Sequence, residues 1–202
     1  KLKILYQKAI TMTPNEKSKV LSEALPYIKK FFGKTIVIKY GGNAMVDKKL
    51  KHSFAKDLVL LKLVGMNPVI IHGGGPQINE ALDKFGKKPI FENGIRVTDE
   101  ETMSIVANVL NDINKQIVSL IKENGGEAIS YSNKKTSGII RAKKIQADKN
   151  SVDLGYVGEI VSINPSFMKE LRDDGIIPII APIGIGSDNK FYNINADVVA
   201  SK

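Results

Sequence analysis

The first residues in this chain that could carry chemistry are a lysine at the end of a short apolar run and the two glycines that follow it. The run is Thr35–Tyr40, Lys39 is its charged residue, and Gly41 and Gly42 come next. An ammonium at the carboxyl end of a buried strand lies where open α/β sheets bind ligands. Glycines let the backbone turn sharply and approach a ligand closely. The pattern predicts a site that handles a phosphate or another anion.

A second apolar run ends in a similar way. Pro68–His72 leads into the triple glycine Gly73–Gly75, and Pro76 then opens a predicted helix. The glycines match neither GxGxxG nor GxxxxGK[ST], so the motif carries little information without its context. A helix that begins directly after it offers backbone N–H groups and a positive dipole end to an anion.

Two later stretches add polar groups to this picture. Arg96 lies in a glycine-containing loop, which we expect to be irregular over Ile90–Val97, and arginine gives a bidentate match to a carboxylate. Asn193, Asn195 and Asp197 alternate, so they project on one side of an extended segment, or else they form a hairpin turn and a helix N-cap. Together these groups predict a site for a small carboxylated molecule that undergoes phosphoryl transfer, a reaction that asks for positioning and charge stabilisation.

Composition narrows the classes of function. The chain has 202 residues and 43% hydrophobic residues, which suits one large soluble domain or two small ones. It has no cysteine and only two histidines, so we expect no metal held by the protein itself. The net charge is +9, but the lysines are scattered and tryptophan is absent, so we expect a solvated surface and no nucleic-acid partner. No apolar run approaches the ~20 residues that cross a bilayer, so we expect no membrane partner.

The elements that must position these groups follow a β-α-β-α order, which predicts parallel strands. We expect a three-layer αβα sandwich with a mainly parallel central sheet, a β-hairpin lid and an N-terminal kinked helix. Three short β-rich runs, Ala128–Tyr131, Gly138–Ile145 and Tyr156–Ile163, predict the antiparallel lid or side layer. Buried-strand character returns at Ile176–Ala181. The helices are expected over residues 48–64, 76–85, 98–123 and 164–174.

The N-terminal region predicts helices of its own. Residues 2–10 form a weak amphipathic pattern, and a stronger helix starts at the capping box Thr13–Glu16 and ends at Gly33. Pro26 is expected to kink it. Its apolar stripe predicts either packing on the core or a contact between subunits. A second capping box is expected at Thr98–Glu101, ahead of the long helix.

The motifs in combination resemble those of the N-acetylglutamate kinases, a branch of the amino acid kinase family. The resemblance runs from about residue 18 to 202, and its motifs are Lys39–Met45, His72–Pro76, Asn93–Thr98 and Tyr192–Asp197. It implies phosphorylation of the side-chain carboxylate of N-acetyl-L-glutamate by ATP with Mg²⁺, in arginine biosynthesis.

The same resemblance implies a role for each matching residue. Lys39 is expected to stabilise the transferring phosphoryl group, and Asp197 to orient the catalytic lysines. The other implied contacts are backbone donors to phosphate at Gly41, Gly42 and Gly73, backbone donors to substrate at Gly74 and Gly75, and side-chain contacts to substrate from Arg96, Asn193 and Asn195.

The resemblance also implies an organisation of the whole protein. Residues 1–33 would be a helical extension for oligomerisation and arginine binding, with Tyr27 at the arginine site, as in arginine-sensitive hexamers. Residues 34–202 would be the substrate lobe, without the C-terminal ATP-binding lobe, so we expect amino-acid binding without efficient kinase activity. Likeness to the cyanobacterial and plastid branch implies PII signalling protein as a partner, and a cytoplasmic or plastid-stromal location.

Two other functions remain open on the sequence. One is another amino acid kinase, acting on carbamate, glutamate, aspartate or uridylate, although the loop Asn93–Thr98 favours the N-acetylated substrate. The other is a non-catalytic module that binds acylglutamate or arginine.

Overall fold

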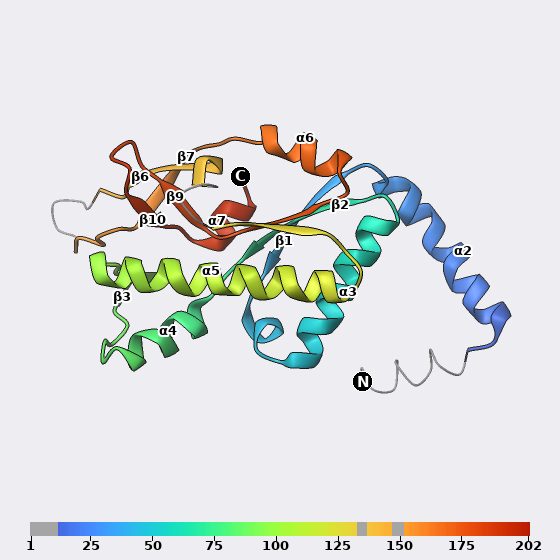
Figure 1. The fold of residues 1–202 in the computed structure, drawn as a ribbon, viewed down its shortest axis with the longest axis horizontal. Helices are drawn as coiled ribbons and strands as arrows, with labels where there is room; N and C mark the ends of the chain where they lie inside the picture. The colour runs from blue at the N-terminus through green and yellow to red at the C-terminus, as the bar shows by residue number, and fades with distance from the viewer. Residues whose placement is uncertain (1–11, 133–136, 147–151) are drawn as a thin grey trace.

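The computed structural model describes residues 12–132, 137–146 and 152–202. The helix that the sequence predicts over residues 2–10 lies outside this part of the chain. The described residues form a four-stranded parallel sheet with helices on both faces and a second four-stranded sheet at one end (Figure 1).

The central sheet has four strands in the order β1-β2-β8-β5, and every neighbouring pair is parallel. The sequence predicts the first three strands correctly. It is wrong about the fourth, because the run expected in the antiparallel lid pairs in parallel with β8. An edge strand is only half buried, and its pattern looks the same in either kind of sheet. The bounds are β1 (Thr35–Tyr40), β2 (Asn67–His72), β8 (Ile177–Ile180) and β5 (Ala128–Tyr131).

Strand β2 shows how the layers are built, because its successive side chains enter different cores. Ile70 packs into the cluster on the side of helices α3 and α5, whereas Val69 and Ile71 pack into the cluster on the side of α7. Figure 1 shows α3 and α5 on one side of the sheet and α6 and α7 on the other, which confirms the three-layer arrangement. The helices are α3 (Lys48–Leu63), α4 (Gly75–Lys84), α5 (Glu100–Glu123), α6 (Ser166–Asp173) and α7 (Ala196–Ala200).

The second sheet has the order β10-β9-β6-β7. Strands β6 and β7 pair antiparallel, as the sequence predicts for the last two β-rich runs. Strands β9 and β10 join them because the chain bends after β8 and crosses from the first sheet to the second. The bounds are β6 (Ile140–Lys144), β7 (Gly158–Ile163), β9 (Ile183–Ile185) and β10 (Phe191–Asn193), with short 3-10 helices at η1 (Gly42–Met45) and η2 (Ser137–Ile139).

A small hairpin follows α4 where the sequence predicts irregular backbone. It consists of β3 (Phe91–Glu92) and β4 (Ile95–Arg96), paired antiparallel. The turn residues Asn93 and Gly94 have φ values of 49° and 79°. Positive φ at both central residues is the requirement of the type I′ two-residue hairpin turn, and Asn-Gly is a preferred sequence for it. The expectation of irregular structure is therefore wrong, although the turn signal is present in the sequence.

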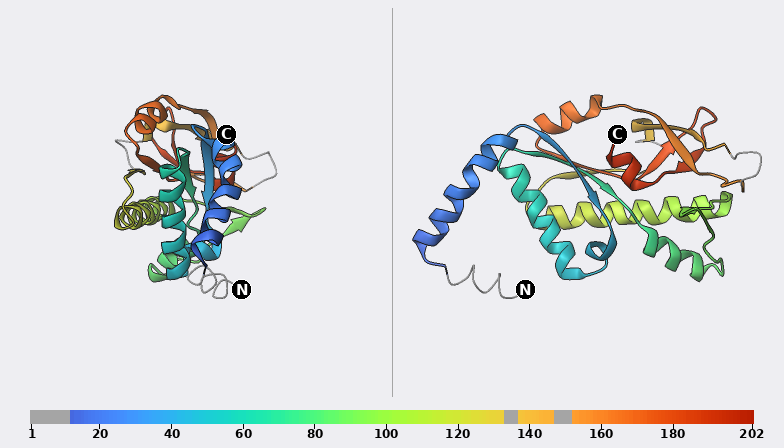
Figure 2. Two further views of the ribbon diagram at one scale, coloured as in Figure 1. Left: turned by 90° about the vertical axis from the view of Figure 1, so that its right-hand side faces the viewer. Right: turned by 180° about the vertical axis from the view of Figure 1, so that it is seen from behind.

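Helix α2 (Pro14–Phe31) has the predicted capping box at Thr13 and Glu16, and it continues through Pro26. No residue of α2 is buried, and the side chains of Val20 and Leu25 are 52% and 62% exposed. Figure 2 shows the helix projecting from the body of the domain. Packing of its apolar stripe on the core is therefore wrong for this chain, and the contact between subunits stays a prediction.

The long helix α5 buries the predicted stripe, with Met103, Val106 and Leu110 among its buried residues. Its N-cap is Asp99, whose carboxylate accepts the N–H of Thr102, and not the predicted Thr98. The Thr98 hydroxyl is buried and donates to the Arg96 carbonyl instead. Both the Thr98 hydroxyl and the Asp99 carboxylate could cap α5. Asp99 does so because the Thr98 hydroxyl is buried and bonded to Arg96.

The backbone beside Thr98 predicts a glycine requirement. Gly155 has a φ of +73°, and a Cβ there would meet the Thr98 carbonyl, which accepts the N–H of Tyr156 at 2.6 Å. Gly86 has a similar φ of +69° but open space around it. We expect Gly86→Ala to cost about 1 kcal/mol in free energy of unfolding, and Gly155→Ala to cost ~2 kcal/mol more. Urea denaturation measures both, and equal losses would contradict the close approach.

His72 is fully buried at the end of β2. Its Nδ1 lies 2.7 Å from the Gly73 carbonyl, so the neutral ring donates from Nδ1. Burial lowers the pKa of His72 to about 4, while the bond to Gly73 and the neighbouring Asn114 oppose the shift. The folded protein therefore holds this imidazole neutral, because a charged ring would have to be desolvated.

This shift predicts a pH dependence of stability. The unfolded chain protonates His72 near pH 6.5 and the folded chain near pH 4, so stability falls as pH is lowered between these values, by at most about 1.4 kcal/mol per unit. We expect His72→Gln to flatten the fall in free energy of unfolding between pH 7 and 4, measured by denaturant titration. The exposed His52→Gln is the control, and an unchanged slope in His72→Gln would exclude this source.

Candidate active site

A pocket of about 260 Å³ lies at the carboxyl ends of β1 and β2. It brings together groups that are far apart in the sequence. The predicted site residues in its lining are Lys39, Gly73, Gly74, Gly75, Arg96, Asn193, Asn195 and Asp197. Of the residues predicted for the site, Gly41 and Gly42 are not in this lining, and Tyr27 lies on exposed α2.

Lys39 reaches the pocket across the turn that follows β1. Its Nζ lies 3.2 Å from Asp197 Oδ1, with the two side chains 40% and 67% exposed. The Lys39 Cε and Nζ both lie 3.2 Å from the position of a Cβ on Gly41, so a side chain there would crowd the ammonium. Gly41 therefore gives Lys39 the space to lie over the loop. Asp197 is fixed in turn by the N-cap bond from its N–H to Asn195 Oδ1.

The triple glycine packs against both the sheet and α5. Gly73 donates its N–H to the Tyr40 carbonyl at 2.8 Å, which ties the two glycine loops together. A Cβ on Gly74 would lie 2.8 Å from Leu110 Cδ2, whereas a Cβ on Gly75 would meet nothing within 4 Å. Gly74 is the N-cap of α4 and makes no side-chain cap bond. The N-terminal N–H groups of α4 thus lie at the pocket, and the N–H of Gly73 is already engaged.

Arg96 is the buried charge of the site, at 7% exposed. Its Nη2 donates to Asn79 Oδ1 at 2.6 Å, and its Cζ lies 4.7 Å from the centre of the Phe91 ring. Its Nη1 is buried and has no hydrogen-bond partner among the described residues. Burial lowers the pKa of Arg96, but a guanidinium stays protonated in proteins. The site therefore presents a desolvated cation that a ligand carboxylate could pair.

Asn193 and Asn195 fit both structures expected from the sequence, the extended segment and the helix N-cap. Asn193 ends β10, and its Nδ2 lies 3.4 Å from Thr98 Oγ1. Asn195 is the N-cap of α7, so the segment is extended only as far as the cap. Both residues nevertheless line the pocket with Asp197. A hairpin strand and a helix cap deliver them to the same place.

Sequence reasoning misses Asn79 and Phe91, which hold Arg96. Asn79 is inside α4, and Phe91 is in the strand that pairs with β4. Their roles depend on how the hairpin folds over α4, and no local pattern signals that contact. Neither residue can be identified without the tertiary structure.

Within the described residues, no group of three or more histidine, aspartate and glutamate side chains could hold a metal ion. A helix with the length and apolar character needed to cross a bilayer is likewise not found in that part of the chain. The polar groups of the pocket can bind a carboxylate at Arg96 and stabilise negative charge near Lys39.

Comparison with known proteins places the chain in a family. The family model described as amino acid kinase matches residues 34–202. The chain is 56% identical over 197 residues to an acetylglutamate kinase of Cupriavidus metallidurans, covering 95% of this chain and 63% of that protein. It is 58% identical over 196 residues to one of Methylobacillus flagellatus, covering 94% and 66%. The chain thus spans about 63% of the length of the first of these relatives.

Solved structures agree on the fold. The N-acetylglutamate synthase of Neisseria gonorrhoeae matches with a TM-score of 0.78 at 23% identity, covering 90% of this chain and 41% of that one. The protein smu.665 of Streptococcus mutans matches with a TM-score of 0.73 at 28% identity, covering 82% and 65%. With the family model matching most of its length, the chain belongs to the amino acid kinase family.

Proposed function

We propose that this chain is the substrate lobe of an enzyme that transfers a phosphoryl group from ATP to the side-chain carboxylate of N-acetyl-L-glutamate, in arginine biosynthesis. The observation that carries the proposal is the buried Arg96, which lines the same pocket as Lys39 and whose Nη1 has no hydrogen-bond partner among the described residues. Support comes from the relatives named acetylglutamate kinase. A dicarboxylate with one carboxylate at each cation fits this arrangement.

In this proposal Arg96 binds the carboxylate that does not react. Asn79 and Phe91 hold the guanidinium in place, so little ordering is needed when the substrate binds. The side chains of Asn193 and Asn195, which line the same pocket, contact the substrate, and the N–H groups of Gly74 and Gly75 bind it at the N-terminus of α4. Gly73 contributes by holding the loops, since its own N–H is engaged by Tyr40.

Lys39 stabilises the negative charge that develops during transfer, and Asp197 orients its ammonium. The residues fit the phosphate end of ATP, because a cation lies over an open glycine turn at Gly41 and Gly42. ATP with Mg²⁺ supplies the phosphoryl group. We assign the nucleotide site to a second lobe in the longer protein, with residues 34–202 as the substrate lobe and 1–33 as an extension.

The exposed apolar face of α2 supports a role for that extension in assembly. We propose that α2 contacts a second subunit within a homohexamer, that Tyr27 contributes to an arginine site, and that PII protein binds the assembly. The enzyme would work in the cytoplasm or, if plastid-encoded, in the stroma. Light scattering of the purified chain tests the assembly, and a monomer at all concentrations would remove it.

Titration calorimetry with N-acetyl-L-glutamate, ATP and arginine, each added separately, tests the proposal as a whole. Binding of N-acetyl-L-glutamate supports the substrate lobe. Binding of ATP by this chain would favour a complete catalytic unit, and binding of arginine without N-acetyl-L-glutamate would favour a sensing module.

Removal of the buried guanidinium should weaken substrate binding. We expect Arg96→Ala to raise the Kd of N-acetyl-L-glutamate, and KM in the longer enzyme, roughly 10- to 100-fold, because a charge-assisted pair contributes about 1.5–3 kcal/mol. Calorimetry measures the effect. Arg141→Ala, on the exposed face of β6, is the matched control and should bind as the original chain does.

Removal of the ammonium should act on turnover. We expect Lys39→Ala to lower kcat of the longer enzyme by about 10²–10³-fold with a small change in KM, as for other groups that stabilise transition-state charge. Steady-state kinetics measures both constants. The exposed Lys34→Ala, just ahead of β1, is the control. If Lys39→Ala and Arg96→Ala both kept normal kinetics, the site would be wrongly assigned.

A further inference from the structure

His72 is a buried imidazole to which the proposed function gives no role. It is the last residue of β2 and is fully buried. The residues before it in the strand, Val69–Ile71, are apolar and buried as well. A histidine at this position lowers stability as the pH falls, because the folded chain keeps the ring neutral. An apolar side chain would avoid that cost, so the hydrogen bonds of the ring indicate what it contributes instead.

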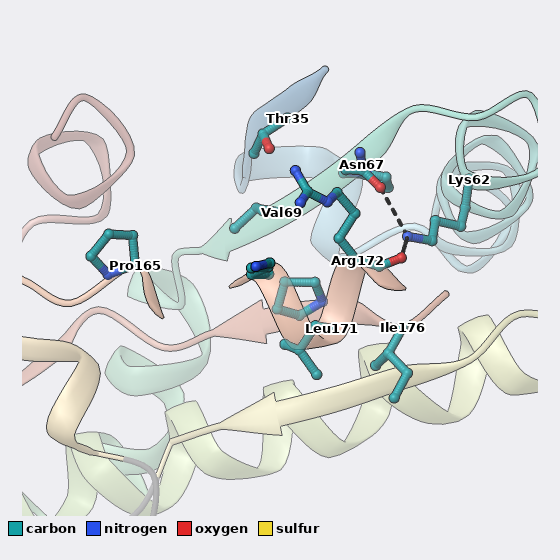
Figure 3. A pocket seen from close by; sticks show the side chains of 11 residues that line it. Thr35, Lys62, Asn67, Val69, Pro165, Leu171, Arg172 and Ile176 are labelled. Atoms are coloured by element: carbon teal, nitrogen blue, oxygen red, sulfur yellow. Dashed lines mark hydrogen bonds between the residues drawn. The ribbon is translucent and has the colours of Figure 1, made fainter. Parts of the chain in front are cut away.

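The other polar residue of β2 shows what a side chain at the end of a strand can do. Asn67, at the amino end, accepts a hydrogen bond from Lys62 Nζ at 3.0 Å, which Figure 3 shows. The Nδ2 of Asn67 donates to the Gly33 carbonyl at 3.2 Å and so holds the backbone that precedes β1. His72 makes the corresponding contact at the carboxyl end of β2, where the backbone belongs to the candidate active site.

The ring of His72 fixes the peptide bond between Gly73 and Gly74. Its Nδ1 lies 2.7 Å from the Gly73 carbonyl oxygen. A carbonyl oxygen can only accept a hydrogen bond, so Nδ1 carries the proton of the neutral ring. The peptide bond is planar and trans, and its C=O and N–H groups therefore point in opposite directions. Because the carbonyl is turned toward the buried ring, the N–H of Gly74 is directed away from it.

The N–H of Gly74 is a donor that a ligand can use. Gly74 lines the active-site pocket and is the N-cap of α4. Its N–H makes no hydrogen bond to another of the described residues, whereas the N–H of Gly73 bonds to the Tyr40 carbonyl at 2.8 Å. The loop thus has one peptide bond fixed by β1 and the next fixed by the ring of His72, and the second leaves its N–H available at the pocket.

Asn114 of α5 is the other polar side chain near the ring. It is fully buried, and its amide raises the pKa of His72 and so opposes the effect of burial. Within the described part of the chain, neither His72 Nε2 nor the polar atoms of Asn114 have a partner in hydrogen-bond geometry. The bond that His72 does make is the one to Gly73, so its contribution is to the loop.

We propose that His72 is a positioning residue, whose Nδ1–H holds the Gly73 carbonyl and thereby directs the N–H of Gly74 toward the substrate. The inference rests on the proposed function, in which that N–H binds the substrate. A donor already held in the direction of an anion loses little freedom when the anion binds, so its orientation improves affinity. His72 acts only through the loop, because its ring is buried beneath the pocket lining and is not part of it.

Two variants with side chains of similar shape separate the hydrogen bond from packing. His72→Asn keeps an N–H donor close to the place of Nδ1, whereas His72→Leu has a similar outline and no donor. We expect His72→Leu to raise the Kd of N-acetyl-L-glutamate roughly tenfold or more, and His72→Asn to bind about fivefold more tightly than His72→Leu. Titration calorimetry measures both. The exposed His52→Leu is the control and should bind as the original chain does.

Folding stability should follow the opposite order. Leucine suits an apolar core better than a buried amide does, so we expect His72→Leu to be at least as stable as His72→Asn in urea at pH 7. If His72 had a structural role alone, substrate affinity would follow stability, and His72→Leu would bind at least as tightly as His72→Asn. That result would overturn the proposal.

NMR of the free chain tests the orientation of the peptide bond without a ligand. With ¹⁵N-labelled histidine we expect the signals of a neutral Nδ1–H ring for His72 at pH 7. We also expect the ¹³C shift of the Gly73 carbonyl to change in His72→Leu and to be largely restored in His72→Asn. A ring protonated on Nε2 instead, or a Gly73 shift that is the same in all three chains, would overturn the proposal.

Failure of the proposed function has a different signature. If the original chain did not bind N-acetyl-L-glutamate, the assignment of the substrate would be wrong. The NMR signals of the free chain would then still decide whether His72 orients the N–H of Gly74.

Discussion

The site depends first on the register of β1 with β2. Tyr40 lies opposite His72 in the ladder, and the N–H of Gly73 donates to the Tyr40 carbonyl one step beyond. This pairing puts both glycine loops at the same edge of the sheet. A slip of one residue would turn every side chain of β1 to the other face and remove Lys39 from the pocket. Burial of β2 on both faces makes such a slip costly, because Val69, Ile70 and Ile71 pack into two different cores.

The two cations of the site differ in their surroundings, and the difference suits different tasks. Lys39 is partly exposed and paired with Asp197. Under the proposed function, its ammonium can therefore adjust to the negative charge that develops during phosphoryl transfer. Arg96 is buried and held by Asn79 and Phe91, and its Nη1 has no hydrogen-bond partner in the described part of the chain. An unsatisfied buried donor costs about 1–3 kcal/mol. Under the proposed function, a carboxylate bound at Arg96 would offset that cost.

The second sheet is connected to the Arg96 hairpin through Thr98. Gly155 lies close to the Thr98 carbonyl. The Nδ2 of Asn193 donates to the Thr98 hydroxyl. Thr98 in turn donates to the carbonyl of Arg96. The strand that carries the amides and the hairpin that carries the guanidinium are therefore joined through one buried threonine.

Local patterns in the sequence determined the parallel strands β1, β2 and β8, the buried stripe of α5, the capping box of α2 and the candidate residues Lys39, Arg96 and Asp197. These features can be predicted because apolar runs, helical periodicity and glycine turns are each patterns of a few neighbouring residues. Tertiary structure alone decided that β5 joins the parallel sheet, that α2 leaves its stripe exposed, that Asp99 caps α5, and that Asn79 holds Arg96. Each of these outcomes depends on whether a segment packs against residues that are distant in sequence. The sequence of one segment does not specify where those residues lie.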